Sequence, residues 1–305
     1  MANRKNITTV FAAFFIFCGF LFTAYPLAFA GREGMDEHHN HTGGMQSGHA
    51  TTEEEIIVEH KTEPASITAG KPTTILFSLT DKEGKPVKGL SVHHDRILHV
   101  VIVAQDFSVF AHIHPEDFGR ITTAMKKTAK FSVKYTFPKA GRYLIGVDFA
   151  KGDQLFSKHF LVNAAGGAGM GFTRADLSRE KRIGDLHVGL ALEPENITAG
   201  KEVTLRYVFK SNREPVTDLE PYLSAPMHIS IISADLDHFI HTHGELPGQP
   251  SMGQHEHHMH MAVPQKFGPK IEAHVVFRAK GLYQIFGQVR HKGEIILTSF
   301  MVEVE

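Results

Sequence analysis

The stretch LHVVIVAQDFSVFAHIHPE, residues 98–116, has the pattern of two short strands joined by a turn. The stretch MHISIISADLDHFIHTHGE, residues 227–245, has the same plan. Their histidines are related by one shift, because 228 − 99, 241 − 112 and 243 − 114 all equal 129. A strand pair that returns with its histidines in register predicts one β module present in two copies.

Further landmarks return outside these strand pairs. EPASITAGK (63–71) is repeated as EPENITAGK (193–201), and AGRY (140–143) is repeated as KGLY (280–283). Between the landmarks lie short runs rich in Val, Ile, Phe and Tyr, which Gly, Pro, Asp and Asn interrupt. Such spacing is typical of sandwiches of about 100 residues. We therefore predict an all-β fold with two tandem immunoglobulin-like β-sandwich domains.

The N-terminal segment has the three parts of a secretory signal. RK (4–5) supplies positive charge, an almost continuous apolar run spans 10–22, and AFA (28–30) offers a small-x-small cleavage site. We predict a signal peptide at 1–30 and a periplasmic or secreted mature protein. A transmembrane anchor is the alternative, which the short apolar run and Pro26 disfavour.

Composition divides the rest of the chain. Residues 31–55 are polar and contain several His and Met, so they are predicted to be disordered, and AAGGAGMG (164–171) has the composition of a flexible linker. The predicted organisation is a signal peptide (1–30), a disordered His/Met-rich segment (31–55), a first sandwich module (56–163), a Gly-rich linker (164–184) and a second sandwich module (185–305) that contains a His/Met-rich insertion (246–268).

The single cysteine, Cys18, lies inside the predicted signal peptide. A mature chain without a thiolate cannot build a blue-copper centre, an iron–sulfur cluster or a thiol catalytic site. The chain has 32 Lys+Arg against 33 Asp+Glu and no basic run, so nucleic acid is not an expected partner. No later apolar run predicts a membrane span after signal cleavage. The unusual component is histidine, with 22 residues.

The spacing of the histidines predicts that each trio shares one face of its strand pair. Residues i and i+2 of a strand point to the same side, so His112 and His114 lie side by side. A four-residue loop pairs Val103 with Phe110, and the same ladder sets His99 opposite His114. The shift of 129 transfers this arrangement to the second module.

Three neutral imidazoles within reach of one another suit zinc or copper. The candidate metal ligands are therefore the two trios: His99, His112 and His114, and His228, His241 and His243. Carboxylates at Glu116, Asp148 and Glu245 are candidate additional ligands or hydrogen-bond partners of the ligands. The alternative is that the histidines are ordinary strand residues bonded to backbone groups. The repetition of the trio favours metal.

A second group of candidate ligands lies in the insertion of the second module. It comprises His255, His257, His258, Met259, His260 and Met261. Thioether sulfur suits Cu(I) and imidazole suits both copper states, so this mixture favours copper over zinc. A solvated polar loop is the alternative. The remaining histidines of the two modules are interpreted as surface or structural residues: His60, His93, His94, His159, His187, His238, His274 and His291.

The apolar strand that ends before Asp106, the stretch FAHIHP (110–115) and the GRY triplet (141–143) together resemble exported bacterial immunoglobulin-like proteins of the YtkA-like kind. The resemblance extends over roughly residues 60–163 and 185–305. It implies small exported sandwiches associated with heavy-metal handling. This chain departs from that pattern in having two modules and a His/Met-rich insertion.

These observations predict a non-enzymatic exported metal-binding protein that acts as a carrier or buffer, with copper as the favoured ion and zinc as the second. Its partners would be the metal ion and another exported metal-handling protein. Two other classes stay open. One is an immunoglobulin-like module that binds a partner and whose histidines are incidental. The other is an enzyme that uses a three-histidine metal site to activate water.

Overall fold

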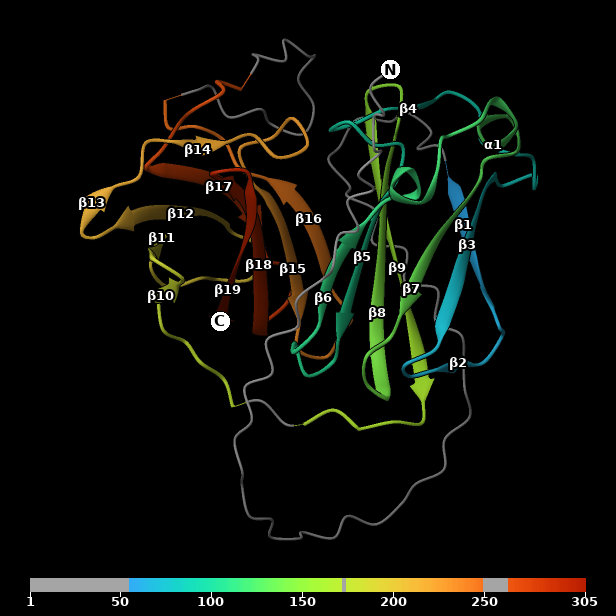
Figure 1. Cartoon of the computed structure of the whole chain (residues 1–305), viewed down its shortest axis with the longest axis horizontal. Helices are drawn as coiled ribbons and strands as arrows, with labels where there is room; N and C mark the ends of the chain where they lie inside the picture. The colour runs from blue at the N-terminus through green and yellow to red at the C-terminus, as the bar shows by residue number, and fades with distance from the viewer. Residues whose placement is uncertain (1–54, 172–173, 249–262) are drawn as a thin grey trace, which may run out of the picture. The chain divides into compact units, whose positions relative to one another are not determined.

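The computed structural model describes residues 55–171, 174–248 and 263–305. The predicted signal peptide, the predicted disordered segment up to residue 54 and positions 249–262 of the predicted insertion lie outside the described residues. The described part of the chain forms two β-sandwiches within a single compact unit (Figure 1).

The first sandwich, which we call module 1, is built mainly of strands. These are β1 (Ile56–Glu63), β2 (Ile67–Thr68), β3 (Pro72–Asp81), β4 (Leu90–Ser91), β5 (His99–Ala104), β6 (Phe110–Ile113), β7 (Lys130–Thr136), β8 (Gly141–Lys151) and β9 (Gln154–Ala165). The 3-10 helix η1 (Pro115–Phe118) and the short helix α1 (Thr123–Thr128) follow β6. Within the described ranges, neither of these helices nor any other is long and apolar enough to cross a membrane.

The second sandwich, module 2, repeats this order of strands. Its strands are β10 (Glu180–Ile183), β11 (Leu186–Glu193), β12 (Glu202–Ser211), β13 (Glu214–Pro215), β14 (Leu219–Glu220), β15 (His228–Ser233), β16 (Phe239–His243), β17 (Lys270–Val276), β18 (Gly281–His291) and β19 (Glu294–Val304). The strands β5 and β6 of module 1 correspond to β15 and β16 of module 2.

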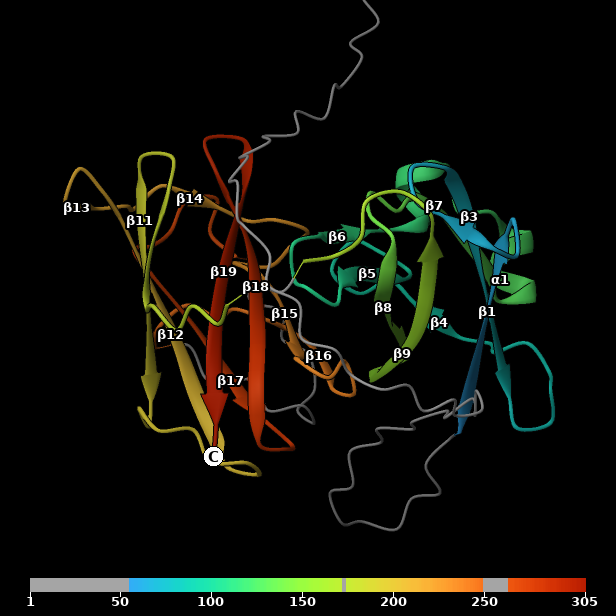
Figure 2. The ribbon, with the colours of Figure 1, turned by 90° about the horizontal axis from the view of Figure 1, so that it is seen from below.

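Both modules divide their strands between two sheets in the same way. In module 1 one sheet has the order β1-β3-β7, and the other contains β9-β8-β5-β6. In module 2 the matching sets are β11-β12-β17 and β19-β18-β15-β16, and Figure 2 shows β11 and β12 in one layer and β18 and β19 in the other. The third, sixth and seventh principal strands thus form one sheet against the first, second and fifth. This is the arrangement of immunoglobulin-like sandwiches, so the predicted fold class is confirmed.

Each module has a core of its own because its strands alternate between buried and half-exposed positions. In β3, for example, Ile75, Phe77 and Leu79 are buried and the residues between them are not. Burying a side chain of this size contributes about 1.5–3 kcal/mol. At the start of β8 and of β18 a buried tyrosine, Tyr143 or Tyr283, donates its hydroxyl to a carbonyl four residues earlier, at 2.8 and 2.9 Å. Such a tyrosine corner is another mark of this fold.

The strands β5 and β15 differ from this alternating pattern because all of their residues are buried. One face of each strand joins the core of its own module. The other faces meet at a junction between the modules, where Val101 and Val103 pack in one apolar cluster with Ile232 and Phe286. Figures 1 and 2 both place β15 and β16 next to β5 and β6. The two modules are therefore joined along the strands that carry the histidine trios.

The predicted linker, 164–184, is shorter in the structure at both ends. Strand β9 continues to Ala165, and β10 pairs with β11 of module 2. The glycine-rich part also contacts module 1, since Gly171 donates its backbone N–H to Asp106 at 3.2 Å and Gly169 forms a bridge with Ala140. The backbone groups of these glycines find hydrogen-bond partners on module 1, which composition alone does not reveal.

Candidate metal centre

The hairpins that carry the histidines have the predicted register. Val103 lies opposite Phe110 and Val101 opposite His112, so the same ladder continues to His99 and His114. In module 2, His228 lies directly opposite His243. The prediction is confirmed because a hairpin with a short loop fixes its own pairing, and a slip of one residue would turn the histidines to the other face.

Within each module the three rings converge on one face. In module 1 the ring centroid of His99 lies 5.3 Å from that of His112 and 5.0 Å from that of His114. In module 2 the ring of His228 lies 4.5 Å from that of His243 and 5.7 Å from that of His241. Each hairpin therefore gathers its three imidazoles as the sequence spacing predicts.

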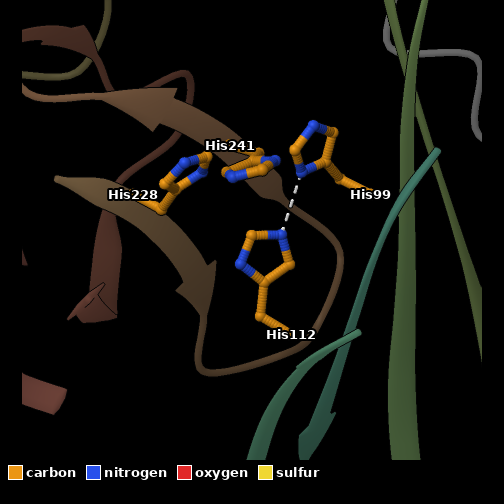
Figure 3. A group of neighbouring side chains, drawn as sticks. All are labelled: His99, His112, His228 and His241. Carbon is orange, nitrogen blue, oxygen red and sulfur yellow. Dashed lines mark hydrogen bonds between the residues drawn. The ribbon is translucent and has the colours of Figure 1, made fainter. Parts of the chain in front are cut away.

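The structure also brings the two trios together, which the sequence did not indicate. Nitrogen atoms of His99, His112, His228 and His241 all lie within 4.8 Å of one another. Figure 3 shows these four rings around a common centre, two from each module. The sequence predicts two separate three-histidine groups, whereas the structure contains a four-histidine group at the junction. We call it the junction site.

Aromatic packing beside the junction site holds the two hairpins against each other. Phe110 of module 1 stacks on Phe286 of module 2, with ring centroids 4.5 Å apart. On the other side Phe239 of module 2 occupies the space above Gly146, where even a Cβ atom would come within 2.4 Å of its ring. The apolar junction thus fixes the distance between histidines that belong to different sandwiches.

One ring nitrogen of each junction histidine is bonded to a group outside the site. His99 donates its Nε2–H to the carbonyl of His93 at 3.0 Å, and His228 donates its Nε2–H to the carbonyl of Tyr222 at 3.1 Å. A carbonyl oxygen can only accept, so the proton of each neutral ring is on Nε2. The two acceptors are themselves related by the shift of 129 residues.

The other two junction histidines are bonded across the module boundary. His112 of module 1 donates its Nδ1–H to the Oε1 atom of Gln288 in module 2 at 2.8 Å. His241 of module 2 donates its Nδ1–H to the carboxylate of Asp148 in module 1 at 2.9 Å. Each module therefore orients one histidine of the other, as outer partners of metal-bound histidines do.

These bonds leave four nitrogen lone pairs directed at the centre of the junction site. The Nδ1 atom of His228 and the Nε2 atom of His241 are buried and have no hydrogen-bond partner. The Nδ1 atom of His99 and the Nε2 atom of His112 lie 3.1 Å apart, although both rings have their proton on the opposite side. Buried acceptors that face one another without a proton repel, so this arrangement is suited to a cation at its centre.

Burial keeps the junction histidines in the neutral form that binds metal. The pKa values of His99, His112 and His228 lie well below the ordinary value, chiefly because burial disfavours a charged ring. Neighbouring imidazoles lower these pKa values further, and His241 does so for all three. The cluster thus offers unprotonated ligands over the whole physiological pH range.

The third histidine of each trio lies beside the junction site. His114 bonds the carboxylate of Asp117 through Nδ1 at 3.1 Å, and its Nε2 lies 3.2 Å from Nε2 of His112. His243 instead groups with His93 and His94, and the ligand nitrogens of these three lie within 4.8 Å of one another. The two trios are therefore equivalent in sequence but not in their surroundings.

His93 and His94 are the residues that sequence reasoning missed. The sequence interpretation places them among surface or structural histidines, whereas the structure places them in a second histidine group. Module 2 has Tyr222 and Leu223 at the equivalent positions, so a search for repeated histidines passes over them. The doublet of adjacent histidines six residues before a candidate ligand was the available signal.

The candidate carboxylates have different roles. Asp148 orients His241, as described above. Glu116 accepts a hydrogen bond from the backbone N–H of Ile97 at 2.8 Å, and Glu245 forms a bridge with Glu272. The predicted ligands of the insertion lie outside the described residues: His255, His257, His258, Met259, His260 and Met261.

Comparison with solved structures finds only remote likeness. The Escherichia coli adhesin FdeC is 11% identical with a TM-score of 0.23, over 81% of this chain and 64% of that chain. The bacterial integrin-binding protein invasin is 10% identical with a TM-score of 0.20, over 81% of this chain and 39% of that chain. Domains 4 and 5 of the S-layer protein SbsC are 11% identical with a TM-score of 0.20, over 82% and 97%. These values are too low to relate the function of this chain to theirs.

No curated protein matches the chain. A family model does match it twice, over residues 51–166 and 181–305, and the two matches coincide with the two sandwiches. The model is described as a domain of unknown function, DUF8832. Because the two matches together extend over most of the sequence, the chain belongs to the DUF8832 family and carries two copies of its domain.

Proposed function

We propose that this chain is an exported, non-enzymatic metal-binding protein that holds one ion between its two modules. The ligands are Nδ1 of His99, Nε2 of His112, Nδ1 of His228 and Nε2 of His241. One observation carries the proposal: all four rings have their outer nitrogen bonded to an acceptor, and their inner nitrogens face a common centre. Neutral imidazoles oriented in this way are typical of metal ligands.

Zinc and copper are the ions that suit four imidazoles. A tetrahedral site with bonds of about 2.0 Å sets neighbouring nitrogens roughly 3.3 Å apart, close to the 3.1 Å between His99 and His112. This geometry fits Zn(II) and Cu(I). The methionines beside the histidines of the predicted insertion and N-terminal segment favour copper as the natural ion.

Four protein ligands favour a carrier or buffer over an enzyme. A tetrahedral ion with four imidazoles has no open position at which water is activated, unlike a catalytic three-ligand site. Ligands from two modules also suggest a means of release, because separation of the modules halves the ligand set. A signal sequence at 1–30 would deliver this carrier outside the cytoplasm.

Competition titration with a chelator of known affinity tests the proposal on the full chain, with Zn(II) and Cu(I) as probes. His99→Ala in module 1 and His228→Ala in module 2 should each remove the same tightly bound equivalent. The loss in affinity should be roughly 100-fold or more, since losing an outer partner alone costs 10–100-fold. His187→Ala, a change of an exposed histidine on β11, is the matched control.

Two results would overturn the proposal. If His99→Ala and His228→Ala removed different equivalents, each module would hold its own ion. If the unaltered chain bound neither ion tightly, the histidines would be incidental, and an interaction module would be the better account of this fold.

A further inference from the structure

The second histidine group lies next to the junction site and has its own ligand set. The ring of His94 lies 3.8 Å from that of His243 and 4.2 Å from that of His93, measured between centroids. Their ligand nitrogens lie within 4.8 Å of one another. His93 and His94 belong to module 1 and His243 to module 2, so this group also depends on the junction.

A tight turn presents the two module 1 histidines. His93 and Arg96 bond each other through their backbones at 2.9 and 3.1 Å, and His94 and Asp95 have left-handed backbone conformations, with φ of 46° and 63°. The turn is tied to module 2, because Ser224 donates its hydroxyl to the carboxylate of Asp95 at 2.6 Å. The position of His94 over module 2 is thus fixed by backbone and side-chain bonds.

An unpartnered nitrogen points to a ligand in this group. The Nε2 atom of His243 is buried and has no hydrogen-bond partner. Burial lowers the pKa of His243, and His94 is the neighbour that lowers it most. A neutral ring with a buried, unsatisfied nitrogen is unfavourable unless a cation or donor occupies the adjacent space.

We propose that His93, His94 and His243 hold a second metal ion of the zinc or copper class, beside the ion of the junction site. Three imidazoles leave one coordination position open, and all three residues are partly exposed, whereas His99, His112 and His228 are buried. The second ion therefore exchanges with solvent or with a small donor ligand more readily than the first. It forms the route by which metal enters and leaves the junction.

The two sites share structural parts, which couples them. The carbonyl of His93 accepts the hydrogen bond that orients His99, and the ring of His228 lies 5.5 Å from that of His94 and 4.5 Å from that of His243. Two paramagnetic ions at these positions lie close enough for their electron spins to interact. This interaction gives a readout that does not depend on affinity.

Module 2 supplies the substitution that removes the second site without disturbing the turn. At the equivalent positions it has Tyr222 and Leu223, and Leu223 adopts the same left-handed conformation, with φ of 48°. The variant His93→Tyr/His94→Leu therefore keeps the turn and the backbone acceptor of His99 while removing two ligands. His187→Ala is again the control.

The full chain is titrated with Co(II) and with Cu(II), followed by optical absorption and by electron paramagnetic resonance. We expect His93→Tyr/His94→Leu to bind one tight equivalent fewer than the unaltered chain and to lose the broadening that marks two coupled Cu(II) ions. His112→Ala/His241→Ala should lose the other equivalent and also lose the broadening. His187→Ala should match the unaltered chain.

The two proposals fail in different ways. If His93→Tyr/His94→Leu kept every equivalent and the broadened signal, the second site would be refuted and the junction site would stand. If His112→Ala/His241→Ala kept every equivalent while His93→Tyr/His94→Leu lost one, the junction site would be refuted and the second site would stand.

Discussion

Modules 1 and 2 bring the same three histidines to the junction but surround them with different groups. Behind His241 stands the carboxylate of Asp148 from module 1, whereas behind His112 stands the amide of Gln288 from module 2. The turn beside His99 contains two histidines, and the turn beside His228 contains Tyr222 and Leu223. The inner ligands are thus repeated and the outer groups are not.

This difference indicates that the junction, rather than either module, is the unit of function. Two independent sites would each keep a complete set of partners within their own sandwich. Here the partner of His112 and the partner of His241 both come from the opposite module. Each sandwich on its own would leave one of its histidines without the acceptor that sets its proton.

Acid should have the largest effect, and it should affect both halves. Burial lowers the pKa values of His99, His112, His228 and His243 in the folded chain, while the unfolded chain titrates near ~6.5. Above that pH both states are neutral. Below it the unfolded chain takes up protons that the folded chain cannot, so the metal-free protein loses about 1.4 kcal/mol of stability per pH unit for each such histidine.

Chemical denaturation of the metal-free chain between pH 7 and pH 5 measures this loss. The decline should become shallower in His228→Asn, because one buried histidine no longer contributes. A free energy of unfolding that is constant over this range would show that the junction opens before the histidines titrate.

A change at the aromatic contacts should have the next largest effect. Gly146 of module 1 corresponds to Phe286 of module 2, and only the glycine leaves space for Phe239. Gly146→Ala should destabilise the chain by roughly 1–3 kcal/mol, as overpacking generally does. It should also weaken metal binding by moving the hairpins apart. Gly169→Ala, where an added Cβ meets nothing within 4 Å, is the matched control and should leave both quantities unchanged.

Exchanging the two outer partners should have the smallest effect. Asp148→Asn makes the partner of His241 an amide, like that of His112, and should weaken metal binding about tenfold because the carboxylate increases the basicity of its histidine. Gln288→Glu should act in the opposite direction. Competition titration of both variants measures the effect. Equal affinities in all three proteins would mean that the outer partners only orient the rings.

The parts of the fold that the sequence could predict are those fixed by local interactions. The hairpin register follows from the loop and the alternation of side chains, so His99 and His114 could be placed opposite each other without a structure. The repeated landmarks likewise predicted two sandwiches. These features depend on residues that lie near one another along the chain.

The joining of the modules depends on surfaces that are far apart in sequence. The available signal was the unbroken apolar run after His99, together with its counterpart after His228, since a strand with one exposed face would alternate. Such a run shows that both faces are buried but not what covers the second face. The repeat itself also drew attention away from His93 and His94, which have no counterparts in module 2.

The central claim is that one ion binds histidines from both modules. X-ray absorption spectroscopy tests it most directly, on the His93→Tyr/His94→Leu chain loaded with a single equivalent of zinc. We predict a first shell of four imidazole nitrogens at about 2.0–2.1 Å, contributed by His99, His112, His228 and His241. A sulfur ligand, or a shell of oxygen with two imidazoles or fewer, would contradict the account and would place the tightest-bound metal elsewhere in the chain.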